Sequence, residues 1–156
     1  EEPNIIVGLV DTYISGEYIG KSQTEPWVAH QAAFVKNSVM KEYRFDSEFK
    51  IFGDLDLWTR LKKNGEFEFQ RIDTLVARME MDGLGSSPIY MGKRIQDYLR
   101  YAKKHRAYSN LIKMIALSLM GWPVYKIFGE KIYLKTFCRG IQNLKALFNR
   151  LFNNHR

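Results

Sequence analysis

Two carboxylates stand where a short helix is expected to begin. Asp54 and Asp56 follow an aromatic residue and a glycine in the stretch Phe52-Gly-Asp-Leu-Asp-Leu-Trp-Thr-Arg60. Carboxylates stabilise helix N-termini by capping them and by facing the positive end of the helix dipole. A carboxylate held at the same place can instead act as a general base that removes a proton from a hydroxyl group. The stretch by itself leaves both interpretations open.

A helix over residues 54–63 is expected to carry these carboxylates. Leu57 and Leu61 are four residues apart and share one face, which predicts that this face is buried. The glycine at position 65 is a typical helix stop. We expect Asp54 to be the N-cap, with the second carboxylate in the first turn.

Strands and helices are expected to alternate through the first half of the chain. The 156 residues are 46% hydrophobic, enough for one domain with a packed core. The fold class expected is therefore α/β. The expected elements are a buried strand over residues 5–10, a turn at 15–17, a returning strand from residue 18, helix-like spacing over 27–40 with a second helix start at 37, a turn at 45–46, two strands near 67–69 and 75–81, and a loop over 82–87.

Charge divides the chain into two unequal parts. Residues 1–85 carry ten Lys and Arg against fifteen Asp and Glu, whereas residues 86–156 carry fourteen against two. The second part should therefore seek phosphates on a membrane surface, a nucleic acid or an anionic substrate. The single cysteine, Cys138, excludes an intrachain disulfide and favours a reducing compartment.

The basic part has the spacing of amphipathic helices. Helical patterns cover residues 91–109 and 134–152, and an apolar run over 111–122 is interrupted by Pro123. Twelve residues are too few to span a bilayer, which needs about 20. Two interpretations stay open: packed helices with a solvated cationic face, or peripheral binding to an anionic membrane. Nucleic-acid binding is not expected, because no recognition motif is present.

Several motifs, taken in order, resemble a known enzyme family. They are His30-Gln31-Ala-Ala-Phe34, Phe45-Asp46, Asp54-Leu-Asp-Leu-Trp-Thr-Arg-Leu61, Lys63-Asn-Gly65 and, only in part, Gly83-Leu-Gly85-Ser86. Together they resemble the C-terminal half of bacterial inverting GT-A glycosyltransferases of the family-two type, which build cell-surface polysaccharides. The resemblance covers residues 5–87. It implies a partial GT-A domain over residues 1–87. The basic helical tail that follows over 88–156 is a candidate for membrane association.

The resemblance implies roles for six residues. It implies transfer of a sugar from a nucleotide sugar to a glycan or lipid-linked glycan acceptor, with inversion, in the hexosyltransferase class. Asp54 corresponds to the general base. The residues expected on the acceptor side are His30, Gln31, Asp56, Trp58 and Arg60.

The residues themselves suggest simpler roles for some of these positions. Asp56 either orients the acceptor or stabilises the helix. Trp58 is expected in the core rather than as a platform on which a sugar stacks, because the other face of its helix must be buried. Arg60 is four residues after Asp56, the spacing of a helical ion pair, and this pairing is favoured over contact with a phosphate. His30 has no Cys, His or Glu at ligand spacing, so no metal site is predicted there.

The family's nucleotide-binding half should precede residue 5. Its Asp-x-Asp motif holds a divalent cation, Mg or Mn, and Asp11-Thr-Tyr13 is not that motif. We therefore expect a fragment that cannot catalyse transfer alone, from a cation-dependent parent in the cytoplasm, peripheral at the inner face of the plasma membrane. The rival hypothesis is a non-enzymatic, membrane-associated binding or scaffold module with an acidic helix cap.

Overall fold

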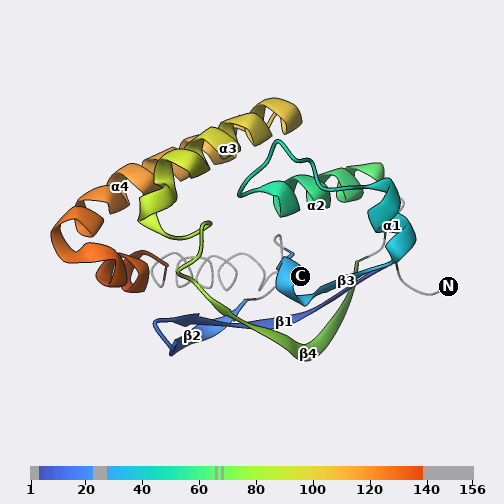
Figure 1. Ribbon diagram of the computed structural model, residues 1–156, viewed down its shortest axis with the longest axis horizontal. Coiled ribbons are helices and arrows are strands. Elements are labelled where there is room, and N and C mark those ends of the chain that lie inside the picture. Colours follow the sequence, from blue (N-terminus) through green and yellow to red (C-terminus); the bar gives the residue numbers. More distant parts are fainter. Residues whose placement is uncertain (1–3, 23–27, 66, 68, 139–156) are drawn as a thin grey trace, which may run out of the picture.

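The chain folds into a mixed sheet with helices packed on one face (Figure 1). The computed structural model describes residues 4–22, 28–65, 67 and 69–138. Four strands form the sheet, and the helices lie in a layer above it in the view of Figure 1. The expected α/β class is confirmed at this level.

The central strand, β1, forms a hairpin with its successor. β1 (Ile5–Ile14) is longer than expected, and it pairs antiparallel with β2 (Glu17–Ser22). The turn between them has positive φ angles of 52° at Ser15 and 76° at Gly16. Two successive positive φ angles give a turn whose twist matches that of the flanking strands. The expected turn and returning strand are thus confirmed.

Two further strands complete the sheet around β1. β4 (Phe69–Glu80) runs parallel to β1 along most of its length, so β3 (Ala33–Val35) and β2 share the other edge. The sequence predicted two strands where β4 is one, with a register shift opposite Gly8. A side chain at position 8 would collide with Val76 on β4, so glycine allows the close approach.

The expected helix-like segment over residues 27–40 is wrong for residues 28–36. The structure has the short 3-10 turn η1 (His30–Ala32), then β3, then α1 (Asn37–Glu42), which starts where the second helix was expected. Residues 33–35 pair with residues 5–7 of β1. Pairing to this strand edge satisfies backbone groups that a short helix would leave to water, and it overrides the weak local pattern.

The second half of the described chain is helical. η2 (Pro88–Tyr90) leads into α3 (Met91–His105), and α4 (Tyr108–Tyr133) runs back beside α3 (Figure 1). Pro123 does not interrupt this helix as expected. Proline has no N–H group to bond to the carbonyl of Leu119, four residues earlier. Leu119 is exposed, so this carbonyl can bond to water instead. The break comes instead at Gly129, with φ 79° and ψ 176°, and the π-helical turn η3 (Leu134–Cys138) ends the described chain.

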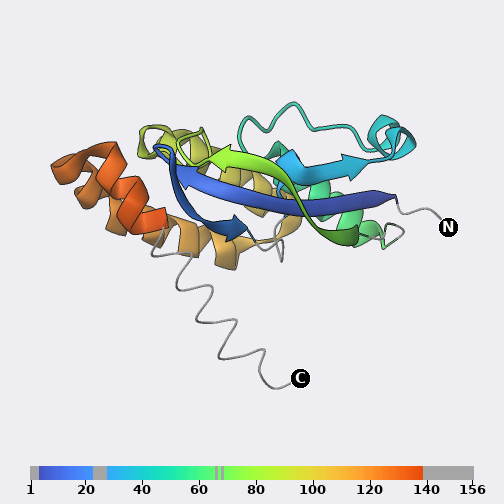
Figure 2. The same cartoon turned by 90° about the horizontal axis from the view of Figure 1, so that it is seen from below.

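Three hydrophobic clusters form the core of the described chain. The first joins the sheet to α2 (Gly53–Asn64), the second joins Phe49 to α3 and α4, and the third joins Ile14 of β1 to the end of α4 and to η3. Figure 2 shows the molecule from below, with the sheet in front and the helices behind it. Two of the three clusters cross the domain boundary expected at residue 87. The predicted helix over 134–152 lies mostly outside the described residues.

Candidate active site at the start of α2

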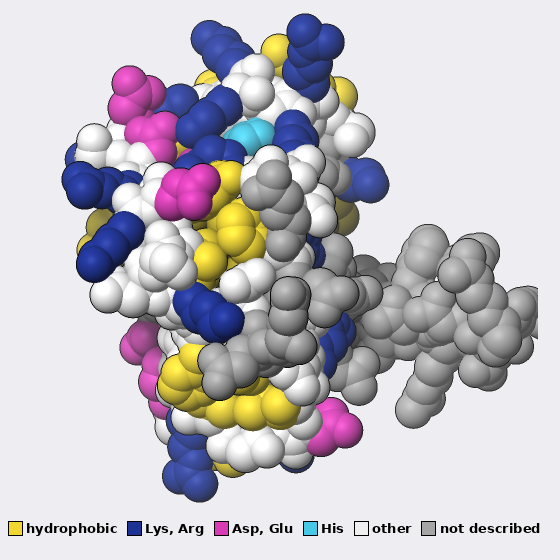
Figure 3. Space-filling view, turned by 90° about the vertical axis from the view of Figure 1, so that its right-hand side faces the viewer, with side chains coloured by type: hydrophobic (Ala, Val, Ile, Leu, Met, Phe, Trp, Pro, Cys, Tyr) yellow, Lys and Arg dark blue, Asp and Glu magenta, His cyan; other side chains and the backbone are white. Residues whose placement is uncertain are grey.

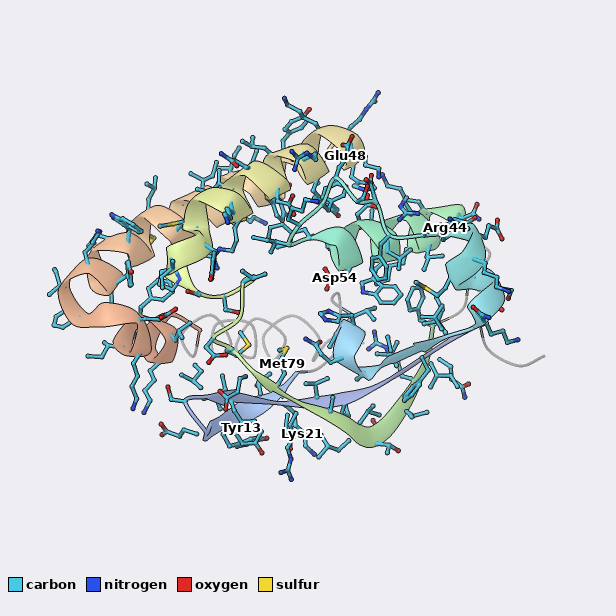
Figure 4. All side chains as sticks on the ribbon, viewed as in Figure 1. Tyr13, Lys21, Arg44, Glu48, Asp54 and Met79 are labelled. Carbon is cyan, nitrogen blue, oxygen red and sulfur yellow. The ribbon has the colours of Figure 1, made fainter. Side chains whose placement is uncertain are left out.

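The Asp54 side chain pairs with His30 in the space between α2 and the sheet. Its Oδ2 lies 2.8 Å from the Nδ1 atom of His30. Figure 4 shows Asp54 pointing from the start of α2 toward the sheet. The His30 side chain is 54% exposed and that of Asp54 30%, so both can reach a ligand from solvent. The structure thus brings together two residues that the sequence placed 24 positions apart.

Asp54 is not the N-cap that the sequence predicted. α2 begins at Gly53 with Phe52 as its N-cap, and Phe52 makes no side-chain cap hydrogen bond. Asp54 lies inside the first turn, where its Oδ1 accepts a hydrogen bond of 2.7 Å from the backbone N–H of Leu55. The carboxylate therefore stays at the positive end of the helix dipole while its Oδ2 faces His30.

The loop before α2 is held by a carboxylate that the sequence analysis missed. Asp97 on α3 is 2% exposed, and its Oδ2 accepts hydrogen bonds from three consecutive backbone N–H groups, those of Lys50, Ile51 and Phe52, at 3.1, 2.8 and 2.9 Å. Arg100 donates to its other oxygen at 3.0 Å. Successive N–H groups that converge on one anion form a rigid nest. Asp97 thereby fixes the backbone that presents Asp54.

A signal for Asp97 was present in the sequence. Asp97 and Glu130 are the only two acidic residues in the basic part of the chain, residues 86–156. Asp97 also lies four residues before the buried Tyr101, on the same face of the helix. A lone carboxylate on the buried face of a cationic helix needs partners, because a buried charge is stable only when it is paired or hydrogen-bonded.

Gln31 lies beside the pair and is tied to the sheet. Its Nε2 donates to the sulfur of Met79 on β4, with 2.9 Å between the two atoms. η1, which carries both His30 and Gln31, packs on β1 and β4. Met79 points from β4 toward the helical layer in Figure 4. The sheet therefore positions the histidine side of the candidate site, and α2 positions the carboxylate side.

The second carboxylate, Asp56, has a different environment. It is fully buried, and its oxygens lie 2.8 Å from Arg60 Nε, 2.9 Å from Lys104 Nζ and 2.8 Å from His105 Nε2. Burial alone would raise its pKa, but the hydrogen bonds from Lys104, His105 and Arg60 outweigh burial and hold the pKa below its usual value. The predicted Asp56–Arg60 pair is confirmed. In this structure Asp56 contacts cations of its own chain.

Lys104 links this buried network to the turn before α2. Its ammonium group also lies 2.8 Å from Asp46, whose pKa is lowered by that hydrogen bond and by one from the backbone N–H of Glu48. Phe49 N–H bonds to the Asp46 carbonyl and closes the turn, as expected near residues 45–46. Figure 3 shows that Lys and Arg side chains gather on the helical layer at this end of the molecule.

Trp58 lies in the core, as the sequence predicted. It is 6% exposed and packs edge-to-face on Phe69, with 6.2 Å between the ring centroids. The six residues implied by the family resemblance therefore occupy two places. His30, Gln31 and Asp54 lie at an accessible surface, whereas Asp56 and Trp58 lie inside and Arg60 bridges Asp56 to the carbonyl of Arg44.

A divalent cation finds no ligand set in the described part of the chain. No group of three or more His, Cys, Asp or Glu side chains comes together there. The His30–Asp54 pair offers two ligands, fewer than such cations take from proteins and substrate together. None of the described residues is therefore assigned as a ligand of the cation expected for the parent enzyme.

In comparisons with protein-family models, curated proteins and solved structures, no match to the chain was found.

Proposed function

We propose that the chain is the acceptor-side part of an inverting GT-A glycosyltransferase, in which the Asp54–His30 pair removes the proton from the acceptor hydroxyl. One observation carries the proposal: the motif residues His30 and Asp54 meet at 2.8 Å at an accessible helix start. The motifs support the family, and the pairing supports a general-base role. The fold supports α/β architecture, and the assignment to GT-A is part of the proposal.

The reaction needs one base at the acceptor. The acceptor oxygen attacks the anomeric carbon of a nucleotide sugar from the side opposite the diphosphate. A C–O bond forms there, the bond from that carbon to the diphosphate oxygen breaks with its electron pair, and the hydroxyl proton goes to the base. A hydroxyl is a weak nucleophile at neutral pH, so a carboxylate within hydrogen-bond reach accelerates this step.

The geometry allows either member of the pair to take the proton. Asp54 is the base implied by the family resemblance. When His30 donates from Nδ1 to Asp54, however, its Nε2 keeps a lone pair that can accept a proton, and Asp54 then orients the ring. If Asp54 is the base, His30→Gln should leave much of the transfer rate. If His30 is the base and Asp54 orients it, His30→Gln and Asp54→Asn should both abolish transfer.

The test is a transfer assay with the protein made from the complete reading frame that contains these residues. Radiolabelled nucleotide sugars are offered with glycan and lipid-linked glycan acceptors. We expect Asp54→Asn to lower kcat by about 10²-fold or more, because positioned general bases contribute about that much. The matched control is Asp73→Asn, on an exposed stretch of β4, which should keep the wild-type rate.

Two results would overturn the proposal. One is wild-type transfer by a folded Asp54→Asn variant, since Asn keeps the shape of the side chain but cannot take the proton. The other is no transfer with any donor by the complete protein. In that case the non-enzymatic membrane-binding module becomes the better hypothesis, and the exposed apolar face of α4 is the observation that favours it.

A further inference from the structure

α4 presents an apolar stripe to solvent. Ile112, Leu119, Met120 and Ile127 are between 67% and 71% exposed. Ala116 and Pro123 are exposed between them. At about 100° per residue, these six positions fall within roughly 100° of the helix circumference and form one continuous stripe. A large exposed apolar patch of this kind is typical of an interaction surface.

The opposite face of α4 holds the helix against the protein along its length. Leu111 packs with Tyr98 and Tyr101 of α3, and Ser118 and Gly121 are buried in the middle of the helix. Toward the end, Ser87 donates a hydrogen bond to Glu130. Tyr133 and Leu134 then pack on Ile14 of the sheet. The outward stripe of α4 therefore faces solvent while the opposite side of the helix is packed.

The charged residues of α4 before its break at Gly129 are both lysines. Lys113 and Lys126 flank it on its two sides, as the same helical spacing shows, and Lys126 lies 4.9 Å from the ring centroid of Trp122. Between Asp97 and Glu130 the sequence has six Lys and Arg and no acidic residue. An apolar stripe bordered by lysines and aromatic side chains matches the interface of a bilayer that contains anionic lipids.

We propose that α4 docks in the plane of an anionic bilayer, with its exposed stripe among the acyl chains and its lysines at the lipid phosphates. The inference does not depend on glycosyl transfer. The sequence suggested only a 12-residue apolar run that ends at Pro123. The structure continues the helix through Pro123, so α4 is long enough to carry the whole stripe.

A helix that crosses the bilayer fits the structure less well. Residues 111–136 are long and apolar enough to cross by length and composition, and only 17% of their most apolar window is buried. However, α4 is packed against α3, so a crossing would carry exposed Arg100 and Lys103 into the hydrocarbon layer. Charged side chains are strongly disfavoured there. The break at Gly129 also ends the regular helix inside this segment.

A second copy of the chain also fits the stripe less well than lipid does. In a symmetric contact between two α4 helices, the stripe would bring Lys113 and Lys126 from each copy and, before Gly129, no carboxylate of the same helix to pair with them. Like charges brought together at an interface weaken it, whereas anionic lipid phosphates attract the same lysines. Charge therefore favours the bilayer.

The test is flotation of the 156-residue chain with vesicles of phosphatidylcholine alone or mixed with phosphatidylglycerol. We expect binding to the mixed vesicles, reduced at least about tenfold by Leu119→Ser combined with Ile127→Ser, since each removes a large apolar group from the interface. Lys113→Gln and Lys126→Gln should each weaken binding roughly fivefold, and only with phosphatidylglycerol. The matched control is Leu75→Ser with Leu84→Ser, two exposed leucines outside α4.

Each other outcome overturns the inference. Equal flotation of the α4 double variant and the wild type would assign lipid binding to another part of the chain. No flotation with phosphatidylglycerol would exclude this membrane surface. On gel filtration, elution of the wild type as a dimer and of the α4 double variant as a monomer would indicate that a second copy covers the stripe. A lower Tm of the double variant would indicate that the stripe is covered by its own chain. None of these results bears on the transfer assay.

Discussion

At the residue scale, two buried carboxylates, Asp56 and Asp97, are held by different kinds of contact. The Asp56–Arg60 pair follows from a separation of four residues on a helix, and the structure has it. Asp97 lies more than 40 residues from the backbone groups that it binds, so only the folded chain reveals the contact. Its lone negative charge in a basic helix was the available hint.

Asp97 should matter for stability as well as for the position of Asp54. Asp97→Asn replaces one carboxylate oxygen by an NH2 group that would face backbone N–H donors. We expect the free energy of unfolding to fall by about 2 kcal/mol, since hydrogen bonds to charged groups are worth about 1.5–3 kcal/mol. Urea denaturation measures this. Asp73→Asn, an exposed change of the same chemistry, should stay within about 0.5 kcal/mol of wild type.

A result for Asp97→Asn that equals the exposed control would mean that the nest of N–H groups before α2 does not depend on the carboxylate. In that case the accurate position of Asp54 must come from the packing of Phe49 and Phe52 against α3 instead.

At the element scale, the strength of the local signal decides what the sequence predicts. α2 has an apolar face and a stop at Gly65, whose φ is 70°, so its bounds differ from expectation by only one residue at each end. Residues 33–35 show no such signal, because β3 is too short for alternation to be read and exists through its pairing with β1. The continuity of β4 depends equally on β1, since the register shift opposite Gly8 breaks the alternation that marks a strand.

The network around Lys104 joins α2 to α3 and makes their contact sensitive to acid. Asp46 and Asp56 both have lowered pKa values in the folded chain. A carboxyl group whose pKa is lower when folded stabilises the protein above its unfolded pKa, which is about 3.9, and this contribution is lost as pH falls through the folded pKa. We therefore expect the free energy of unfolding to fall as pH drops from about 5 toward 2.

The variant that tests this assignment is Lys104→Met, because Lys104 is hydrogen-bonded to both carboxylates. Its stability should depend less steeply on pH in the acid range, measured by thermal unfolding at a series of pH values. Lys103→Met, on the exposed neighbouring position of α3, is the matched control and should keep the wild-type slope. Equal slopes for the two variants would place the acid sensitivity in other carboxylates.

At the scale of the whole molecule, the sequence suggests two parts and the packing joins them. Net charge changes from negative to positive near residue 87, yet two hydrophobic clusters join residues from both sides of that boundary. The charge pattern is read from composition alone, whereas the burial of Tyr98 and Tyr101 against Phe49 depends on the antiparallel return of α4 beside α3. Composition therefore predicted the chemical character of the two halves but not their contact.

This packing predicts that the two halves unfold together. Phe49, 7% exposed, and Ile14, fully buried, belong to the first half, and both would be uncovered if α3 and α4 came away from the sheet. The change in far-UV circular dichroism, which reports mainly on the helices, should therefore coincide with the change in near-UV circular dichroism, which reports on the packed Tyr and Trp side chains of both halves. Tyr101→Ala should lower both midpoints equally, by the several degrees expected when a buried aromatic contact costs about 3 kcal/mol. Two separated transitions, with the variant moving only one of them, would show instead that the boundary at residue 87 divides independently stable domains.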